Sequence, residues 1–292
     1  MTQTVYISEY LKDDVSNKVK YGEHVYQQLN NIDEIEIKKI EKHSKNVWCR
    51  DYMPIKGATG ELVHFDYSPP YMMDTDKWKA RRPKREDLRN DLKVPSIDSD
   101  IILDGGAIEI HGTSAIVSDR VFRDNKLPEE EVIEKIKKAL KLERLIVVPQ
   151  HPFDFTGHVD GMVRFIDSET VFISEMLADG KVKELEVETN SYRRQLIDNW
   201  YYAFKYSLIN AGFKLEKLPC TAHLNKNDKS GHGIYLNFLK LDGLILMPSY
   251  KQDEDFVAQK QLETLYGAKV IMIDATELSE EGGMINCVTW TK

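Results

Sequence analysis

Polar residues beside glycine or proline recur along this chain at intervals near 50 residues, each time next to a predicted strand. Asp51, Asp104 and His158 are spaced by 53 and 54 positions, and Asn237 and Cys287 by 50. The one longer interval, 79 positions from His158 to Asn237, contains a long predicted helix. A period of this size is typical of a repeated supersecondary unit. Five units would suit a closed ring with the polar segments at its centre, but coincidence in a chain with 16 glycines is the alternative.

Short apolar strands alternate with amphipathic helices between these segments, which predicts an α/β fold. Predicted strands cover residues 4–7, 62–65, 145–148 and 269–273, and predicted helices cover 15–29, 128–142, 193–211 and 256–266. The chain has 292 residues with 41% hydrophobic content, enough for a sizeable core. We expect a single domain over residues 1–292.

Charge and cysteine content narrow the class of protein. The formal net charge of −8 disfavours binding to nucleic acids or anionic membranes. The three cysteines are odd in number and widely spaced, which argues against a disulfide framework and a zinc knuckle. No signal peptide and no apolar run long enough to span a bilayer is recognisable. We therefore expect a cytoplasmic protein, and the sequence does not indicate its oligomeric state.

Cys287 is the first candidate for chemistry, because it follows Gly282 and Gly283 and precedes a short apolar segment. Glycines let a ligand approach the backbone closely, and a thiol at the start of a strand could be exposed and reactive. A lone cysteine beside a strand is, however, more often a small buried hydrophobe.

His158 and Asp160 form the second candidate pair. They are two positions apart, so in a strand their side chains would point the same way and could supply an acid/base and an anionic anchor. A surface pair or metal ligands are the alternatives. A metal would need further ligands, and His151, His223 and His232 have no compact ligand spacing. We expect no metal and no cofactor.

Two further carboxylates lie beside predicted strands. Asp51 follows Arg50, and the two could equally form a structural ion pair. Asp104 precedes two glycines, and that segment could simply be a turn.

The combination of segments resembles the agmatine deiminase and bacterial peptidyl-arginine deiminase family of the guanidino-group-modifying (pentein) superfamily. The family patterns W-x-R-D-x-G-P, E-G-G, G-H-x-D, Y-x-N-F and G-G-G-x-H-C-x-T occur in the same order here. The matching segments are Trp48-Cys49-Arg50-Asp51-Tyr52-Met53-Pro54, Asp104-Gly105-Gly106, Gly157-His158-Val159-Asp160, Tyr235-Leu236-Asn237-Phe238 and Gly282-Gly283-Met284-Ile285-Asn286-Cys287-Val288-Thr289.

The resemblance implies a five-bladed α/β propeller with pseudo-fivefold symmetry and a central active site. It also implies a hydrolase that converts a guanidinium group to a ureido group and ammonia. Cys287 would be the nucleophile and His158 the acid/base, with Asp104 orienting the imidazole. Asp51 and Asp160 would hold the guanidinium, with Trp48 and Arg50 in the substrate-binding segment. The substrate would be a small cationic guanidino compound: agmatine, arginine or an arginyl peptide.

Three departures from the family patterns concern the site. Asp104 replaces a glutamate, Asn286 replaces the histidine before the cysteine, and Met53 replaces a glycine. The chemistry looks complete, but the pocket for the rest of the substrate looks altered. An amidinotransferase, which shares the covalent intermediate, and a non-catalytic binder of guanidino ligands stay open as alternatives.

Overall fold

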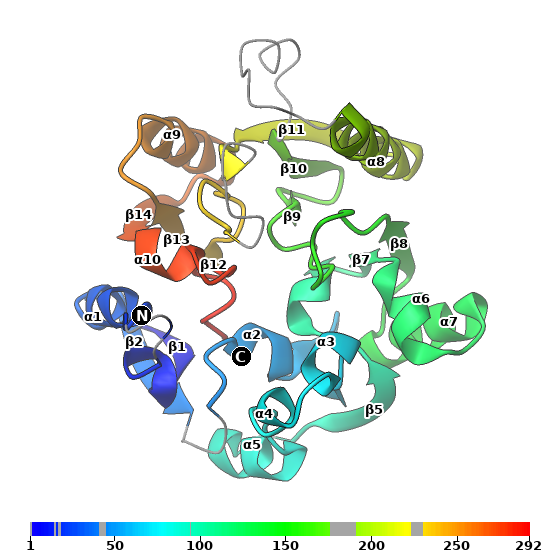
Figure 1. Ribbon diagram of the computed structural model, residues 1–292, viewed down its shortest axis with the longest axis horizontal. Coiled ribbons are helices and arrows are strands. Elements are labelled where there is room, and N and C mark those ends of the chain that lie inside the picture. Colours follow the sequence, from blue (N-terminus) through cyan, green and yellow to red (C-terminus); the bar gives the residue numbers. More distant parts are fainter. Residues whose placement is uncertain are drawn as a thin grey trace.

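The computed structural model describes residues 2–14, 16, 19–40, 45–93, 95–175, 191–222 and 230–292. Within these ranges the strands form five small sheets. Figure 1 shows the sheets following one another in chain order around the centre of the view, with the longer helices on their outer side. The α/β fold expected from the sequence is confirmed.

Four of the sheets share one topology. In each, an antiparallel pair of strands is followed by a helical connection and a third strand parallel to the second. The sheets are β3 (Ile55–Lys56), β4 (Leu62–Asp66) and β5 (Ile97–Ile102); β6 (Ile108–His111), β7 (Ser114–Ser118) and β8 (Arg144–Val148); β9 (Val163–Phe165), β10 (Thr170–Glu175) and β11 (Lys214–Pro219); and β12 (Leu239–Leu241), β13 (Leu244–Ser249) and β14 (Lys269–Asp274).

The connections between the second and third strands carry the main helices. They are α3 (Pro70–Met73), α4 (Asp76–Lys79) and α5 (Arg85–Leu92) before β5; α6 (Arg120–Asn125) and α7 (Glu129–Leu140) before β8; α8 (Ser191–Asn210) before β11; and α9 (Glu254–Tyr266) before β14. Besides α1 (Glu23–Asn30), described below, the remaining helical segments of the described residues are η1 (Glu9–Lys12), α2 (Cys49–Tyr52), η2 (Gly105–Ala107) and α10 (Thr276–Ser279). The period near 50 in the sequence is thus the length of one strand–strand–helix–strand unit.

The fifth sheet joins the two ends of the described chain. Strand β1 (Gln3–Ser8) pairs in parallel with β2 (Ile35–Ile40), and helix α1 (Glu23–Asn30) lies in the connection between them. On the other side of β1, Trp290 forms an antiparallel bridge with Tyr6, with N–O distances of 2.7 and 2.9 Å. Backbone hydrogen bonds therefore hold the segment that carries Cys287 against strand β1 of this sheet.

Helix α7 illustrates why these residues form these elements. Glu129, Glu130 and Glu131 occupy its first turn, where negative charge is favourable. Val132, Ile136 and Leu140 recur every four residues and are fully buried against β5 and β8. Each such burial contributes about 1.5–3 kcal/mol before the entropic cost of ordering the side chain. The helix ends at Leu140, two residues before the predicted end at Leu142, because Lys141 adopts a left-handed conformation.

Two sequence predictions need correction. The helix expected over residues 15–29 begins only at Glu23, and Val15, Asn17 and Lys18 lie outside the described residues. The strand expected after Cys287 is absent: residues 285–288 form a turn, closed by the Thr289 hydroxyl, which donates to Ile285 O at 2.6 Å. In the described part of the chain, no helix is long and apolar enough to cross a membrane.

Candidate active site

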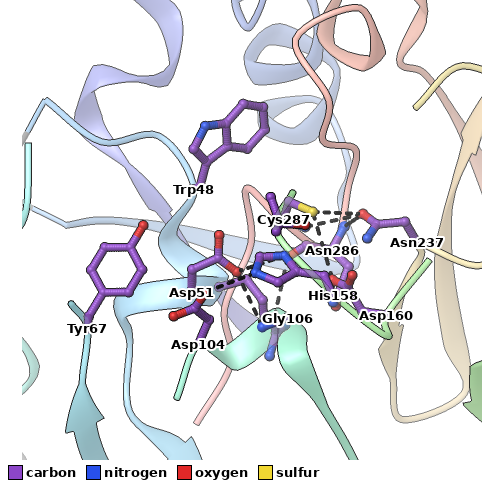
Figure 2. A network of polar contacts seen from close by, with 12 residues as sticks. Trp48, Asp51, Tyr67, Asp104, Gly106, His158, Asp160, Asn237, Asn286 and Cys287 are labelled. Carbon is purple, nitrogen blue, oxygen red and sulfur yellow. Dashed lines mark hydrogen bonds and ion pairs between the residues drawn. The ribbon is translucent and has the colours of Figure 1, made fainter. Parts of the chain in front are cut away.

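Five side chains singled out by the sequence lie close together in Figure 2, although they come from four separate segments. Asp51 belongs to α2, and Asp104 directly precedes η2. His158 and Asp160 lie in the loop between β8 and β9, and Cys287 lies in the turn after α10. Their exposed fractions range from 0% for Asp104 to 11% for the His158 side chain. Charges in this cluster are therefore poorly screened by water.

Gly106 lets two of these segments approach each other. A Cβ atom at this position would lie 2.5 Å from Nδ1 of His158 and 2.9 Å from Oδ1 of Asp51, too close for any other residue. The Gly106 amide donates to Oδ1 of Asp51 at 3.3 Å, and its carbonyl accepts from the Val159 amide at 2.8 Å. The double glycine after Asp104 is thus required by close packing of the site.

The His158 imidazole lies between two carboxylates. Its Nε2 is 3.1 Å from Oδ2 of Asp104, and its Nδ1 is 3.7 Å from Oδ1 of Asp51. Burial by itself would lower the pKa of His158, but the charges of Asp51, Asp104 and Asp160 outweigh it and raise the pKa to about 9. The imidazole is therefore protonated at neutral pH and can donate a proton.

Asp104 is paired through one oxygen, Oδ2, while its buried Oδ1 has no hydrogen-bond partner in the described structure. Besides His158, its Oδ2 accepts hydrogen bonds from Tyr71 Oη and Arg120 Nη2, both at 2.8 Å. Burial would raise its pKa, but the Arg120 and His158 charges and hydrogen bonds lower the pKa of Asp104 to about 2. Asp104 is therefore a fixed negative charge next to the imidazole.

Asp51 is held less tightly. Burial, and to a smaller extent the neighbouring charges of Asp104 and Asp160, raise the pKa of Asp51 to about 7, while His158 acts in the opposite direction. Because the raised pKa means that the ionised form of Asp51 is disfavoured, a cation placed beside it would stabilise the carboxylate.

Cys287 and Asn237 face each other across the site. Oδ1 of Asn237 accepts from the Cys287 amide at 3.3 Å and lies 3.4 Å from its Sγ, which is in turn 3.8 Å from Oδ2 of Asp160. Burial, together with the charges of Asp160 and Asp51, raises the pKa of the Cys287 thiol well above its usual range. In the absence of substrate, Cys287 is therefore a protonated thiol. A cation placed between Cys287 and the carboxylates would favour the thiolate.

Asn286, at the position where the family pattern has histidine, contacts Asp160. Its Nδ2 donates to Oδ2 of Asp160 at 2.8 Å, and its backbone amide is 3.1 Å from Oδ1 of Asn237. This residue therefore links Asp160 to the segment that carries Cys287.

Trp48 and Arg50 lie at the edge of the cluster. The Trp48 ring is half-buried and stacks on Tyr21, with ring centroids 6.4 Å apart. The Arg50 amide donates to Cys287 O at 3.1 Å, and its Nε donates to Asn286 O at 3.4 Å. Through these two hydrogen bonds Arg50 stabilises the segment that carries Cys287.

The local geometry around His158 differs from the sequence expectation. His158 and Asp160 were expected to share one face of a strand, but residues 157–159 are not part of a strand, residues 160–162 form a turn, and β9 begins only at Val163. The turn is fixed by the Gly106 carbonyl, which also accepts from the Asp160 amide at 3.3 Å. The two side chains reach the same site through this turn.

Three polar residues at the site were not assigned a role from the sequence: Tyr71, Arg120 and Asn237. Asn237 lies in one of the recurring segments, so the period pointed to it. Tyr71 and Arg120 have no such signal, because they meet Asp104 only through the packing of α3 and α6 against the site.

In the part of the chain that the structure describes, no group of three or more His, Cys, Asp or Glu side chains is arranged so that it could hold a metal ion. His151 packs edge-on against Trp200, and His232 packs against Tyr250. His223 lies outside the described residues.

Known proteins with a similar sequence or fold include agmatine deiminases. The chain is 23% identical over 300 residues to the agmatine deiminase of Pseudomonas fluorescens, covering 88% of this chain and 77% of that one. The agmatine deiminase of C. jejuni superposes with a TM-score of 0.72 at 19% identity, over 99% of this chain and 92% of that one. A dimethylarginine dimethylaminohydrolase superposes with a TM-score of 0.57 at 12% identity, over 99% of each chain.

The fold and the site define a deiminase, a hydrolase that acts on the C–N bonds of a guanidino group. A model of the Porphyromonas-type peptidyl-arginine deiminase family matches residues 5–292. The chain belongs to that family, and the resemblance seen in the sequence motifs is confirmed.

Proposed function

We propose that Cys287 is the nucleophile of this deiminase and that the reaction proceeds through a covalent thiouronium. The observation that carries the proposal is the convergence of one thiol, one imidazolium and three carboxylates in a buried cluster. A guanidinium is planar, cationic and weakly electrophilic, so its hydrolysis needs paired anionic acceptors, a thiolate and a proton donor.

In the first half-reaction, the Cys287 thiol loses its proton to solvent when the cation binds, Asp51 and Asp160 hold the guanidinium nitrogens, and the thiolate attacks the central carbon. His158 gives its proton to the departing nitrogen, the C–N bond breaks, and ammonia leaves. In the second half-reaction, neutral His158 takes a proton from water, which attacks the thiouronium carbon. The C–S bond breaks, the remaining hydroxyl proton of the intermediate passes to the departing sulfur, and the neutral ureido product is released with the thiol restored.

The remaining site residues support these steps. Asp104 orients His158 through its 3.1 Å contact. We propose Trp48, whose ring stacks on Tyr21, and Arg50, which is hydrogen-bonded to the segment that carries Cys287, as further substrate-binding residues. The bound cation offsets the negative charge around Cys287, so substrate binding itself promotes thiolate formation.

For the substrate we propose a small cationic guanidino compound. Agmatine ranks first because two of the three proteins compared above are agmatine deiminases, and free arginine and arginyl peptides follow. Incubation with these three compounds, scored for ammonia and ureido product, tests the choice. Hydrolysis of agmatine is the expected result. Transfer of the amidino group to an added amine, or binding without turnover, would overturn the proposal.

We further propose that residues 1–292 form one deiminase domain with the five sheets as blades of an α/β propeller of pseudo-fivefold symmetry. The repeated strand order in four sheets and the Tyr6–Trp290 bridge support it. A truncation that removes residues 288–292 is expected to lower the melting temperature of the whole chain in a single transition. Independent melting of separate parts would contradict the single domain.

The proposed chemistry uses only protein groups, so we propose that no metal or organic cofactor is needed. Dialysis against a chelator should leave activity unchanged, and loss restored by added zinc or manganese would contradict this. All three cysteines are free and buried, which is typical of proteins in a reducing compartment, and we propose a cytoplasmic location. Cell fractionation followed by activity assay tests it.

A further inference from the structure

Arg120, the first residue of α6, is buried and makes three contacts that the mechanism above does not use. Its Nη2 donates to Oδ2 of Asp104 at 2.8 Å, and its Nε lies 2.8 Å from Oδ2 of Asp124. Its Nη1 donates to the carbonyl of Thr156, two residues before His158. With an exposed fraction of 3%, this guanidinium is a buried cation joined both to Asp104 and to the loop that carries the imidazole.

The loop is shaped to pass close to Arg120. Gly157 has a φ of +63°, a conformation that other residues rarely adopt, and a Cβ atom there would lie 2.9 Å from Cδ of Arg120. The glycine before His158 is therefore explained by the presence of the arginine side chain beneath it. The backbone conformation at Gly157 therefore allows the loop to contact Arg120.

One oxygen of Asp104 is shared by the catalytic imidazole and by Arg120. Oδ2 lies 3.1 Å from Nε2 of His158 and 2.8 Å from Nη2 of Arg120, and Tyr71 Oη donates to it as well. When His158 gives up its proton, a fully buried carboxylate loses one of its two cationic neighbours. An unpaired buried carboxylate is costly, and Arg120 is the neighbour that remains.

The charged groups that face His158 and Asp104 come from several elements. Asp51 approaches from α2 and Asp160 from the same loop as His158, while Arg120 and Asp124 belong to α6. The neutral groups are the Tyr71 and Tyr67 phenols and the Cys287 thiol. Among the cations, Arg50 of α2 interacts with Asp160, whereas Arg120 is the arginine in direct contact with Asp104.

We propose that Arg120 is a positioning residue of the deiminase reaction, acting as a second counter-ion that keeps Asp104 ionised while His158 passes its proton to the departing nitrogen and takes another from water. The inference rests on the proposed roles of Cys287 and His158. No atom of Arg120 contacts the reacting carbon. It acts through Asp104 and through the loop of His158.

The test uses the pH dependence of kcat/KM for agmatine. In the unaltered enzyme, the acid limb follows Asp51, with a pKa of about 7, and the alkaline limb follows His158, with a pKa of about 9. Arg120→Gln removes a positive charge, which raises the pKa of every neighbouring group. Both limbs should therefore move to higher pH by about one unit. The kcat at the new optimum should fall by about tenfold or more, with KM within about threefold, because His158 holds its proton more tightly.

Two matched variants separate charge from packing. Arg120→Lys keeps the charge with fewer donors, so both limbs should stay within about 0.3 pH units of the unaltered enzyme even though its melting temperature falls. Arg123→Gln removes an exposed arginine from the same helix and should change neither limb. Loss of activity in Arg120→Gln with unmoved limbs would show that Arg120 is only a structural brace, and would overturn the proposal.

Asp124→Asn provides a test that does not depend on the folding of Arg120→Gln. It removes the carboxylate that competes for the Arg120 charge, so the alkaline limb should move to lower pH, and an unchanged or higher limb would overturn the proposal. NMR titration of the His158 ring in the resting enzyme gives a readout without substrate. Its pKa should rise in Arg120→Gln and fall in Asp124→Asn. If no guanidine is hydrolysed but this titration behaves as expected, the proposed function fails while the pairing of Arg120 with Asp104 and His158 stands.

Discussion

Asn286 Nδ2 donates a 2.8 Å hydrogen bond to Oδ2 of Asp160, the same oxygen that lies 3.8 Å from Sγ of Cys287. This contact uses the position where the family's pattern has histidine. It holds one carboxylate at a fixed distance from the thiol, because the hydrogen bond restricts rotation of the carboxylate. The side chain of Asn286 therefore sets where a cation bound to Asp160 would lie relative to the thiol.

Asn286→Ala should lower kcat/KM about tenfold, through both KM and kcat. A cation held by a loosened carboxylate is misplaced as well as weakly bound, and misplacement by about 1 Å can cost on the order of 100-fold in rate. Steady-state kinetics with agmatine measures the effect. Asn30→Ala, at an exposed position at the end of α1, is the matched control and should be neutral. Near-normal kinetics of Asn286→Ala would show that Asp160 needs no such support.

Asp51→Asn and Asp160→Asn should each lose about tenfold or more in kcat/KM. Both carboxylates require a cationic, planar group, so an amide in either place removes one anchor and the charge that holds the substrate. Competition experiments should also show that guanidines bind better than the neutral ureido product. Equal competition by citrulline-like compounds, or unchanged kinetics of both variants, would show that the anchors are misassigned.

The structure changes the control for that experiment. From the sequence, the acidic run 253–255 at the start of a helix is expected to tolerate Asp→Asn changes. Asp255 is in fact buried, and its Oδ1 accepts hydrogen bonds from Tyr235 Oη at 2.7 Å and the Tyr250 amide at 3.0 Å. Asp253 is exposed, so Asp253→Asn is the proper control.

Cys287→Ala should fold and show no turnover. Removal of a covalent nucleophile costs several orders of magnitude in rate, whereas a thiol-to-methyl change at a turn disturbs little packing. Thermal unfolding checks the fold, and ammonia release checks the turnover. Cys49→Ala and Cys220→Ala, at the two other buried thiols, should retain most activity. Substantial ammonia release by Cys287→Ala would exclude the thiouronium route.

The sequence indicated the parts of the site that have a local chemical signature. The segments around Asp51, Asp104, His158 and Cys287 each combine a polar residue with a glycine or a strand end, so their period exposed both the repeat and the candidate residues. The motif order then indicated the family. The glycine beside Asp104 is visible in the sequence because the site requires it: Gly106 must lack a side chain where His158 and Asp51 meet.

Residues that act through tertiary contacts carried no comparable signal. Arg120 follows an ordinary strand, and in sequence it cannot be told from the exposed Arg123 three positions later. Asp255 likewise resembles its exposed neighbour Asp253, because acidic residues are favourable at any helix start. Burial separates the two members of each pair, and burial depends on the packing of distant segments.

His64 should make the free energy of unfolding depend on pH in a range that the active-site histidine does not explain. It lies in β4 with an exposed fraction of 1%, and its Nε2 has no hydrogen-bond partner in the described structure. Burial, assisted by the positive charges of Arg89 and Arg85, lowers the pKa of His64 from 6.5 to about 4. The folded protein therefore holds this ring neutral, while the unfolded chain protonates it below about pH 6.5.

The sign of the effect follows from proton binding. Between about pH 6.5 and pH 4 the unfolded chain binds the additional proton, so stability falls as the pH falls, by about 3 kcal/mol over the whole range. His64→Asn cannot titrate, so its unfolding free energy should change less over this range than that of the unaltered protein, even if the variant is less stable at pH 7. Urea unfolding at pH 7.0, 5.5 and 4.5 measures both curves. Parallel curves for the two proteins would mean that His64 is protonated equally in the folded and unfolded states.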